Sequence, residues 1–192
     1  GSVGAGLVLY LVSCSMLSPV ALVLSPVPLV AFVIYPYMKR FTPLAHFGVG
    51  IALSLAPLGG FIAVTASIGD AVAVLWLAGF TLFWVSGFDI IYATLDIEFD
   101  RAEGLQSLPV RLGRRPALVV SMFTHLLAVG CLVGLFVEDL SGGFAITGIV
   151  ATGIVLGAEH WLAERVNLAF FQLNIIAGFL VFGVVLAGKQ GW

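Results

Sequence analysis

Charged side chains are scarce in this sequence. Lys and Arg number 8 and Asp and Glu number 10 among 192 residues, or 9% of the chain, whereas an ordinary soluble domain carries about 25%. Hydrophobic residues make up 61%, and the mean hydropathy is +1.17. This composition excludes a soluble globular domain and a disordered chain. The net charge of −2 gives no basic surface for nucleic acid.

Cysteine and histidine are also few, with 2 and 3 residues. Cys14 and Cys131 lie far apart in apolar runs, which predicts neither a disulfide framework nor a metal-binding pair. His46, His125 and His160 show no metal-ligand spacing, and we expect packing or interfacial positions for them. No signal-peptide pattern opens the chain.

Long apolar runs dominate the rest of the sequence. A membrane-spanning helix needs about 20 apolar residues, and cutting the chain at its charges and its Pro and Gly clusters predicts seven such helices. Pro19, Pro26 and Pro28 interrupt the first two, and a polar stretch from Glu159 to Asn167, expected to be solvated, precedes the last. The predicted helices cover residues 3–17, 20–38, 43–66, 71–95, 116–137, 142–160 and 168–188. The predicted fold class is therefore an all-α, polytopic transmembrane helix bundle.

The basic residues are distributed in a way that supports this count. Seven of the eight fall in alternate connections, which share one side of the membrane, and only Lys189 falls on the other side. The opposite connections hold Asp70, Glu138 and Asp139. By the positive-inside rule, the basic side is predicted to be cytoplasmic. The seven residues are Lys39, Arg40, Arg101, Arg111, Arg114, Arg115 and Arg165.

Half of all the charges lie between Asp89 and Arg115. At about 100° per residue, a continuous helix would place Asp89, Tyr92, Asp96 and Asp100 on one face, here termed the acidic face. Asp89 lies inside the fourth predicted span, where an acid is costly and usually faces the bundle interior or a water-filled cavity. Stacked carboxylates repel each other. They are tolerated when they bind a divalent cation or share protons.

The chemistry that the acidic face favours is binding of Mg²⁺ together with a diphosphate. Mg²⁺ prefers oxygen ligands and is commonly bound by one or two carboxylates plus substrate phosphates. The alternative is a solvated helix end whose acids pair with nearby arginines. That alternative applies best to Glu98, Asp100 and Glu103, and less well to Asp89 with Asp96, because of the depth of Asp89.

A second polar cluster, Tyr35-Pro-Tyr-Met-Lys-Arg-Phe-Thr42, lies where the second span meets the same side of the membrane. Lys39 and Arg40 could hold diphosphate oxygens through charge-assisted hydrogen bonds. The alternative is that they anchor the helix at the membrane surface, with Tyr35 and Tyr37 as interfacial aromatic residues.

Three segments taken together resemble the UbiA family of intramembrane aromatic prenyltransferases. They are Tyr35-Pro-Tyr-Met-Lys-Arg-Phe-Thr42, Asp89-Ile-Ile-Tyr-Ala-Thr-Leu-Asp-Ile-Glu-Phe-Asp100 and Gly104-Leu-Gln-Ser-Leu-Pro-Val-Arg-Leu-Gly113. The second matches the family's C-terminal motif, Asp-x-x-Tyr-x-x-x-Asp-x-x-x-Asp. The resemblance covers essentially the whole chain and is closest to 4-hydroxybenzoate polyprenyltransferases, including related enzymes of menaquinone synthesis.

The resemblance implies nine transmembrane helices around a central cavity, with two aspartate-rich motifs that bind Mg²⁺ and the diphosphate of a polyprenyl substrate. It implies transfer of the polyprenyl group to an aromatic acid such as 4-hydroxybenzoate, in ubiquinone or menaquinone synthesis at a bacterial inner membrane. The first motif, Asn-x-x-x-Asp-x-x-x-Asp, is not found before Tyr35. We therefore expect residues 1–192 to form one N-terminally truncated prenyltransferase-like domain with seven of the nine helices. Within it, residues 96–115 are expected to form a cytoplasmic loop rich in Asp and Arg.

The resemblance also implies roles for the charged residues. Asp96 and Asp100 would be the Mg²⁺ ligands. Lys39 and Arg40 would neutralise the diphosphate, and Arg111 would close over the substrate from its loop.

The same resemblance implies catalytic roles for the two deeper residues of the acidic face. Asp89 would organise the pocket near the reacting carbon, and Tyr92 would stabilise the allylic cation or hydrogen-bond a neighbour. Two other classes of function stay open. A transporter or proton relay would use Asp89 and Asp96 as titrating groups, although no second acidic helix pairs with the first. A non-catalytic membrane fragment would only pack against other helices.

Overall fold

The computed structural model describes residues 2–163 and 171–191. Within these residues, six helical segments are long and apolar enough to cross a membrane. They are Pro19–Arg40, Ala45–Thr65, Val72–Ala93, Arg114–Asp139, Gly143–Trp161 and Phe171–Gln190. The all-helical, multi-pass fold predicted from the sequence is confirmed.

Each predicted span overlaps a helical segment with nearly the same ends. The first, α1 (Ser2–Leu17), has 16 residues and is shorter than a helix that crosses a membrane usually is. Arg165 and residues 168–170 of the last predicted span lie outside the described part of the chain.

The second span consists of three consecutive pieces. These are α2 (Pro19–Leu24), α3 (Pro26–Ile34) and a 3₁₀ helix, η1 (Tyr35–Arg40). Proline begins both α2 and α3, because its fixed φ and missing N–H suit the first helical position. The Ser18 hydroxyl caps α2 by accepting the Ala21 N–H at 3.0 Å. The prolines therefore divide this span without ending it.

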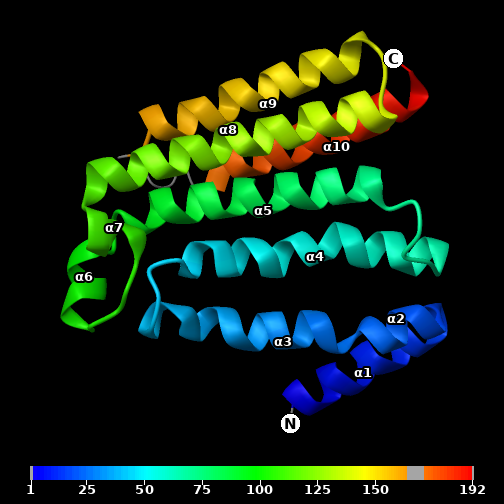
Figure 1. Ribbon diagram of the computed structural model, residues 1–192, viewed down its shortest axis with the longest axis horizontal. Coiled ribbons are helices and arrows are strands. Elements are labelled where there is room, and N and C mark those ends of the chain that lie inside the picture. The colour runs from blue at the N-terminus through cyan, green and yellow to red at the C-terminus, as the bar shows by residue number, and fades with distance from the viewer. Residues whose placement is uncertain (1, 164–170, 192) are drawn as a thin grey trace.

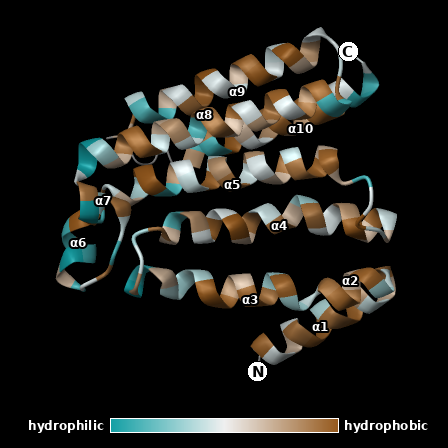
Figure 2. Ribbon diagram, in the orientation of Figure 1, coloured by the Kyte–Doolittle hydropathy of each residue, from teal (hydrophilic) through white to brown (hydrophobic). Residues whose placement is uncertain are grey.

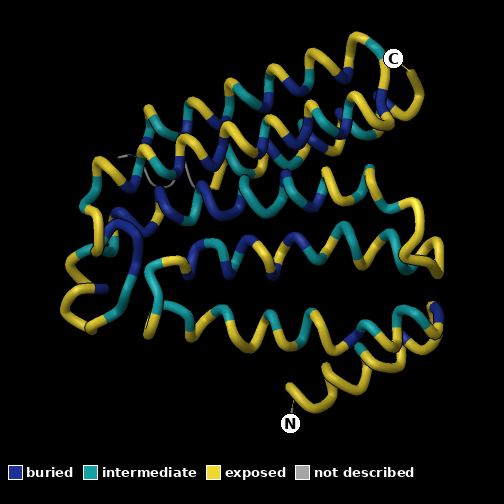
Figure 3. The backbone as a smooth tube through the Cα atoms, viewed as in Figure 1, coloured by how far each residue is buried: buried dark blue, intermediate teal, exposed yellow. Residues whose placement is uncertain are grey.

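The long helices pack side by side, largely in chain order (Figure 1). α4 (Ala45–Thr65) packs on α5 (Val72–Ala93), α5 on α8 (Arg114–Asp139), α8 on α9 (Gly143–Trp161), and α9 on α10 (Asn174–Gln190). The main buried core lies among α5, α8, α9 and α10. The outer faces are apolar yet exposed (Figures 2 and 3), as expected of helices that face lipid.

A glycine sets the close spacing of α4 and α5. A Cβ atom on Gly50 would lie 2.5 Å from the Leu82 carbonyl oxygen and nearer still to Ser86 Oγ. Small residues of this kind let membrane helices approach closely.

Replacing Gly50 with leucine is therefore expected to push α4 away from α5. Overpacking of a tight contact costs roughly 1–3 kcal/mol, so the unfolding temperature in detergent should fall by several degrees. Gly60→Leu is the matched control, because a Cβ at Gly60 on the same helix meets open space. Equal unfolding temperatures for the two variants would contradict this account of the packing.

Polar residues gather at one end of the bundle, here termed the loop end (Figure 2). η1, α6 (Ile97–Ala102) and α7 (Leu108–Leu112) all lie at this end (Figure 1). Lys189 pairs with Asp139 at the opposite end, with Nζ 2.5 Å from Oδ2. Among the described residues, the connections rich in basic side chains thus lie at the same end of the bundle, as their alternation in the sequence predicted.

Candidate active site

The acidic face does not lie on one helix. α5 ends at Ala93, and Asp96 is the N-cap of the separate short helix α6. The prediction that Asp89, Tyr92, Asp96 and Asp100 lie on one face of a continuous helix is therefore wrong.

The break has a local cause in the hydrogen bonds around Thr94. The Thr94 hydroxyl donates to the Ile91 carbonyl at 2.7 Å, and the backbone N–H groups of Thr94 and Leu95 bond to carbonyls three residues earlier, at 3.1 and 3.0 Å. Bonds of this 3₁₀ type tighten and close the last turn of an α-helix. The chain then turns, and α6 runs as its own element across the loop end.

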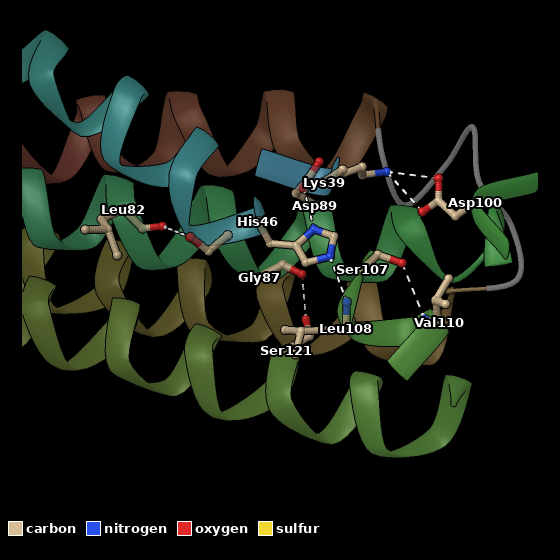
Figure 4. A network of polar contacts seen from close by, with 11 residues as sticks. Lys39, His46, Leu82, Gly87, Asp89, Asp100, Ser107, Leu108, Val110 and Ser121 are labelled. Carbon is tan, nitrogen blue, oxygen red and sulfur yellow. Dashed lines mark hydrogen bonds and ion pairs between the residues drawn. The ribbon is translucent and has the colours of Figure 1, made fainter. Parts of the chain in front are cut away.

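Lys39 and Asp100 form an ion pair that joins η1 to α6 (Figure 4). Lys39 Nζ lies 3.2 Å from Asp100 Oδ2 and 3.4 Å from Oδ1. The Asp100 side chain is 2% exposed and that of Lys39 is 31% exposed. A carboxylate buried to this degree needs a charged or hydrogen-bonding partner. The pair brings together two of the predicted site residues, one from each polar cluster.

A backbone hydrogen bond reinforces this contact. The Gln106 N–H donates to the Lys39 carbonyl at 2.6 Å. Gly104, at φ +67°, supplies the left-handed turn that brings the connection after α6 back toward η1. The segment between α6 and α7 is therefore held against η1 at Lys39, the residue that also pairs with Asp100.

A buried histidine links Asp89 to α7 (Figure 4). His46 is 0% exposed, and its Nδ1 lies 2.6 Å from Asp89 Oδ2. The Leu108 N–H donates to His46 Nε2 at 3.4 Å. Since Nε2 accepts a hydrogen bond, the ring proton lies on Nδ1 and is donated to Asp89. Sequence reasoning expected a packing or interfacial position for His46 and missed this contact, because a lone histidine in an apolar run carries no spacing signal.

The other predicted site residues are more open. Asp96 is half-buried, and its side chain makes no capping hydrogen bond at the start of α6. The Arg40 guanidinium lies over the Tyr37 ring, 5.5 Å from its centroid, which is a cation–π contact. Tyr92 and Arg111 are both exposed. Among the described residues, Lys39–Asp100 and His46–Asp89 are thus close pairs of the site, and neither of them includes Arg111.

Mg²⁺ fits the donor chemistry of α6. In residues 2–163 and 171–191, no three His, Cys, Asp or Glu side chains converge to hold a metal ion by themselves. One or two carboxylates are enough, however, when substrate phosphates supply further oxygen ligands. The Asp100 N–H donates to the Asp96 carbonyl at 2.7 Å, so the two acids are one helical turn apart and share a face of α6.

A second buried polar group lies between α8 and α9. His160 Nε2 is 3.1 Å from His125 Nδ1, and His125 Nε2 is 3.8 Å from Glu159 Oε2. Glu159 is 1% exposed, so the expectation that it is solvated is wrong. α9 continues through Trp161 and turns this carboxyl group inward against α8.

Fold and site together define a multi-pass membrane protein with a charged site at one end of its helix bundle. The sequence model of the UbiA prenyltransferase family matches residues 2–170. The chain belongs to the UbiA prenyltransferase family, as the three sequence motifs indicated.

Individual relatives agree with this assignment. A 4-hydroxybenzoate solanesyltransferase from Synechocystis sp. is 33% identical over 97% of this chain and 66% of its own length. The mitochondrial 4-hydroxybenzoate polyprenyltransferase of Dictyostelium discoideum is 35% identical over 77% of this chain and 30% of its own length. The chain thus spans less than two thirds of either relative.

A solved structure shares the fold. The apo structure of a UbiA homolog from Aeropyrum pernix K1 superposes with a TM-score of 0.85 at 33% sequence identity. The match covers 96% of this chain and 70% of that chain. The helical arrangement described above is therefore shared with this UbiA homolog.

Proposed function

We propose that the protein is an Mg²⁺-dependent prenyltransferase. It transfers a polyprenyl group from polyprenyl diphosphate to an aromatic acid of the 4-hydroxybenzoate type, in ubiquinone or menaquinone synthesis. The observation that carries the proposal is the Lys39–Asp100 pair beside Asp96 at the end of an apolar bundle. One cation and two carboxylates at that position suit the headgroup of a substrate whose tail is a hydrocarbon.

The Lys39–Asp100 pair offers a simple route to substrate binding. On this proposal, Lys39 exchanges Asp100 for diphosphate oxygens, while Asp100 joins Asp96 in holding Mg²⁺. Every buried charge keeps a partner in both states, which avoids the cost of an unpaired charge. Arg40 and Arg111 add positive charge around the diphosphate from η1 and from the end of α7. Bound Mg²⁺ would stabilise the negative charge that develops on the leaving diphosphate.

The chemistry requires one bond to break and another to form. The allylic C–O bond of the prenyl diphosphate breaks, and diphosphate leaves with the electron pair. The electron-rich ring of the acceptor forms the new C–C bond, and the attacked ring carbon then gives its proton to a base such as the released diphosphate. We propose that Tyr92 and Asp89 stabilise the positive charge of the allylic carbon. The apolar helix faces would keep water from that carbon.

We also propose that the loop end faces the cytoplasm, in a bacterial inner membrane. Six of the eight basic residues lie in the described connections at that end, namely Lys39, Arg40, Arg101, Arg111, Arg114 and Arg115, and cytoplasmic loops collect Lys and Arg. The polar diphosphate end of a membrane-held polyprenyl substrate, and a water-soluble aromatic acid, would then meet at the cytoplasmic end of the bundle.

The proposed reaction can be tested on the protein in membranes. Geranyl diphosphate and 4-hydroxybenzoate should give a prenylated acid, detected by mass spectrometry, when Mg²⁺ is present. Chelation of the metal with EDTA should lower product to background, and added Mg²⁺ should restore it. Product formation that EDTA leaves unchanged would contradict the metal role. A flux of substrate driven by a proton gradient, without metal or product, would instead support a transporter.

A further inference from the structure

We infer that His46 is a positioning residue for prenyl transfer. It bonds both the Asp89 carboxylate and the first turn of α7, and so fixes the position of one relative to the other. The inference rests on the proposed function for its kinetic part, while its structural part can be tested without activity.

His46 lies where three elements meet. It is in the first turn of α4, Asp89 is near the end of α5, and Leu108 is the first residue of α7. The imidazole ring is fully buried, whereas 31% of the Asp89 side chain is exposed. His46 therefore binds one Asp89 carboxylate oxygen from the buried side, while part of the Asp89 side chain stays exposed.

The short contact restricts the Asp89 carboxylate. A donor–acceptor distance of 2.6 Å between Nδ1 and Oδ2 is typical of a strong, charge-assisted hydrogen bond. Without it the carboxylate could rotate about its terminal torsion, which is broad in free side chains. A displacement of about 1 Å in a group that acts on the reacting atoms can lower a rate about a hundredfold.

The second ring nitrogen acts on α7. Leu108 is at the helix start, where backbone N–H groups have no acceptor within the helix. The Ser107 hydroxyl accepts the Val110 N–H at 3.4 Å, and His46 Nε2 accepts the Leu108 N–H. Leu108 is 7% exposed, so removal of this acceptor would leave a buried donor unsatisfied.

These contacts tie the segment that carries Arg111 at two points. On the side of η1, the Gln106 N–H is bonded to the Lys39 carbonyl. On the side of α4, His46 bonds Leu108. His46 therefore couples the orientation of Asp89 to the placement of residues 105–113.

Two substitutions separate this role from simple core packing. His46→Leu keeps an apolar side chain of moderate size but removes both hydrogen bonds. His46→Gln keeps a donor and an acceptor, since the amide N–H can reach Asp89 and the amide oxygen can accept from Leu108. Ser121→Ala is the matched control, because the Ser121 hydroxyl donates to the Gly87 carbonyl at 2.6 Å (Figure 4) and also ties two helices near the site.

The structural test is hydrogen–deuterium exchange of the purified protein, followed by mass spectrometry. In His46→Leu, amides of residues 105–113 should exchange at least about fivefold faster than in the wild type, as expected for loss of one hydrogen bond. In His46→Gln and Ser121→Ala, this segment should exchange at the wild-type rate. Equal protection of the segment in His46→Leu and the wild type would overturn the inference.

The kinetic test is a double-mutant cycle with Asp89→Asn. His46→Leu alone should lower kcat roughly 10–100-fold with a smaller change in KM, and His46→Gln should recover most of the loss. In the Asp89→Asn background, His46→Leu should cause little further loss, because both changes act through the same carboxylate. Multiplicative losses would overturn the inference, since they would show that His46 acts independently of Asp89.

The two tests distinguish a failure of the proposed reaction from a failure of the proposed coupling through His46. An inactive wild type whose residues 105–113 lose protection in His46→Leu counts against the proposed reaction and supports the coupling. An active wild type with an unaffected His46→Leu variant counts against the coupling alone.

Discussion

Replacing Asp96 with asparagine is expected to lower prenyl transfer by about a thousandfold, the upper range for removal of one charge-stabilising group. The change keeps the size of the side chain and removes one of the two carboxylates offered to Mg²⁺. Asp96 is half-buried and makes no capping hydrogen bond, so its loss should leave the fold intact. The rate of product formation with geranyl diphosphate and saturating Mg²⁺ measures the effect.

Glu98→Gln is the matched control for this prediction. Glu98 is an exposed carboxylate on the same short helix, so the substitution makes the same change in net charge. Transfer by this variant should stay near the wild-type rate. Similar losses in both variants would show that the effect is a general one of charge at the loop end, which would count against Asp96 as a ligand.

Lys39→Met is expected to affect both activity and stability. The diphosphate loses a direct cationic partner, and transfer should fall about a hundredfold or more. In the free protein, the buried Asp100 carboxylate is left without its ion-pair partner, and breaking a buried pair in this way typically costs about 3–5 kcal/mol. Because Lys39 is partly exposed, solvent screening places the expected loss at the lower end of that range. Thermal unfolding in detergent and product formation measure the two effects.

The double variant Lys39→Met/Asp100→Asn separates those effects. Neutral asparagine removes the buried charge, so much of the stability should return while transfer stays low. Lys189→Met is the control for loss of a Lys–Asp pair, because the Lys189–Asp139 pair lies at the opposite end and is more exposed. It should change stability by no more than about 1 kcal/mol and leave transfer unchanged. Recovery of transfer in the double variant would contradict a diphosphate role for Lys39.

The long helices were predictable because membrane spans are set by apolar length, and charges mark their ends. The break between α5 and α6 was not predictable in the same way. The residues from Ala93 to Asp96 include neither Pro nor Gly, and the turn depends on a Thr94 side-chain bond to the backbone. Helical periodicity alone therefore extended the acidic face by two turns beyond the true helix end.

The site was predictable in its location and less so in its contacts. Alternation of the basic connections placed the Lys39 and Asp100 segments at one end, and the structure brings these two residues into contact. The buried His46 was missed because a lone histidine in an apolar run carries no spacing signal. Its partner Leu108 contributes only a backbone N–H, which no side-chain motif can reveal.

Binding of a non-reactive substrate analogue tests the central claim most directly, because it does not depend on turnover. Isothermal titration of the purified protein with geranyl thiodiphosphate should show binding that requires Mg²⁺. Asp96→Asn and Lys39→Met should each weaken that binding at least about tenfold, the effect of losing roughly 1.4 kcal/mol, while Glu98→Gln and Lys189→Met should match the wild type. Binding of equal strength without Mg²⁺, or in Asp96→Asn, would contradict the assignment of this site to Mg²⁺ and diphosphate.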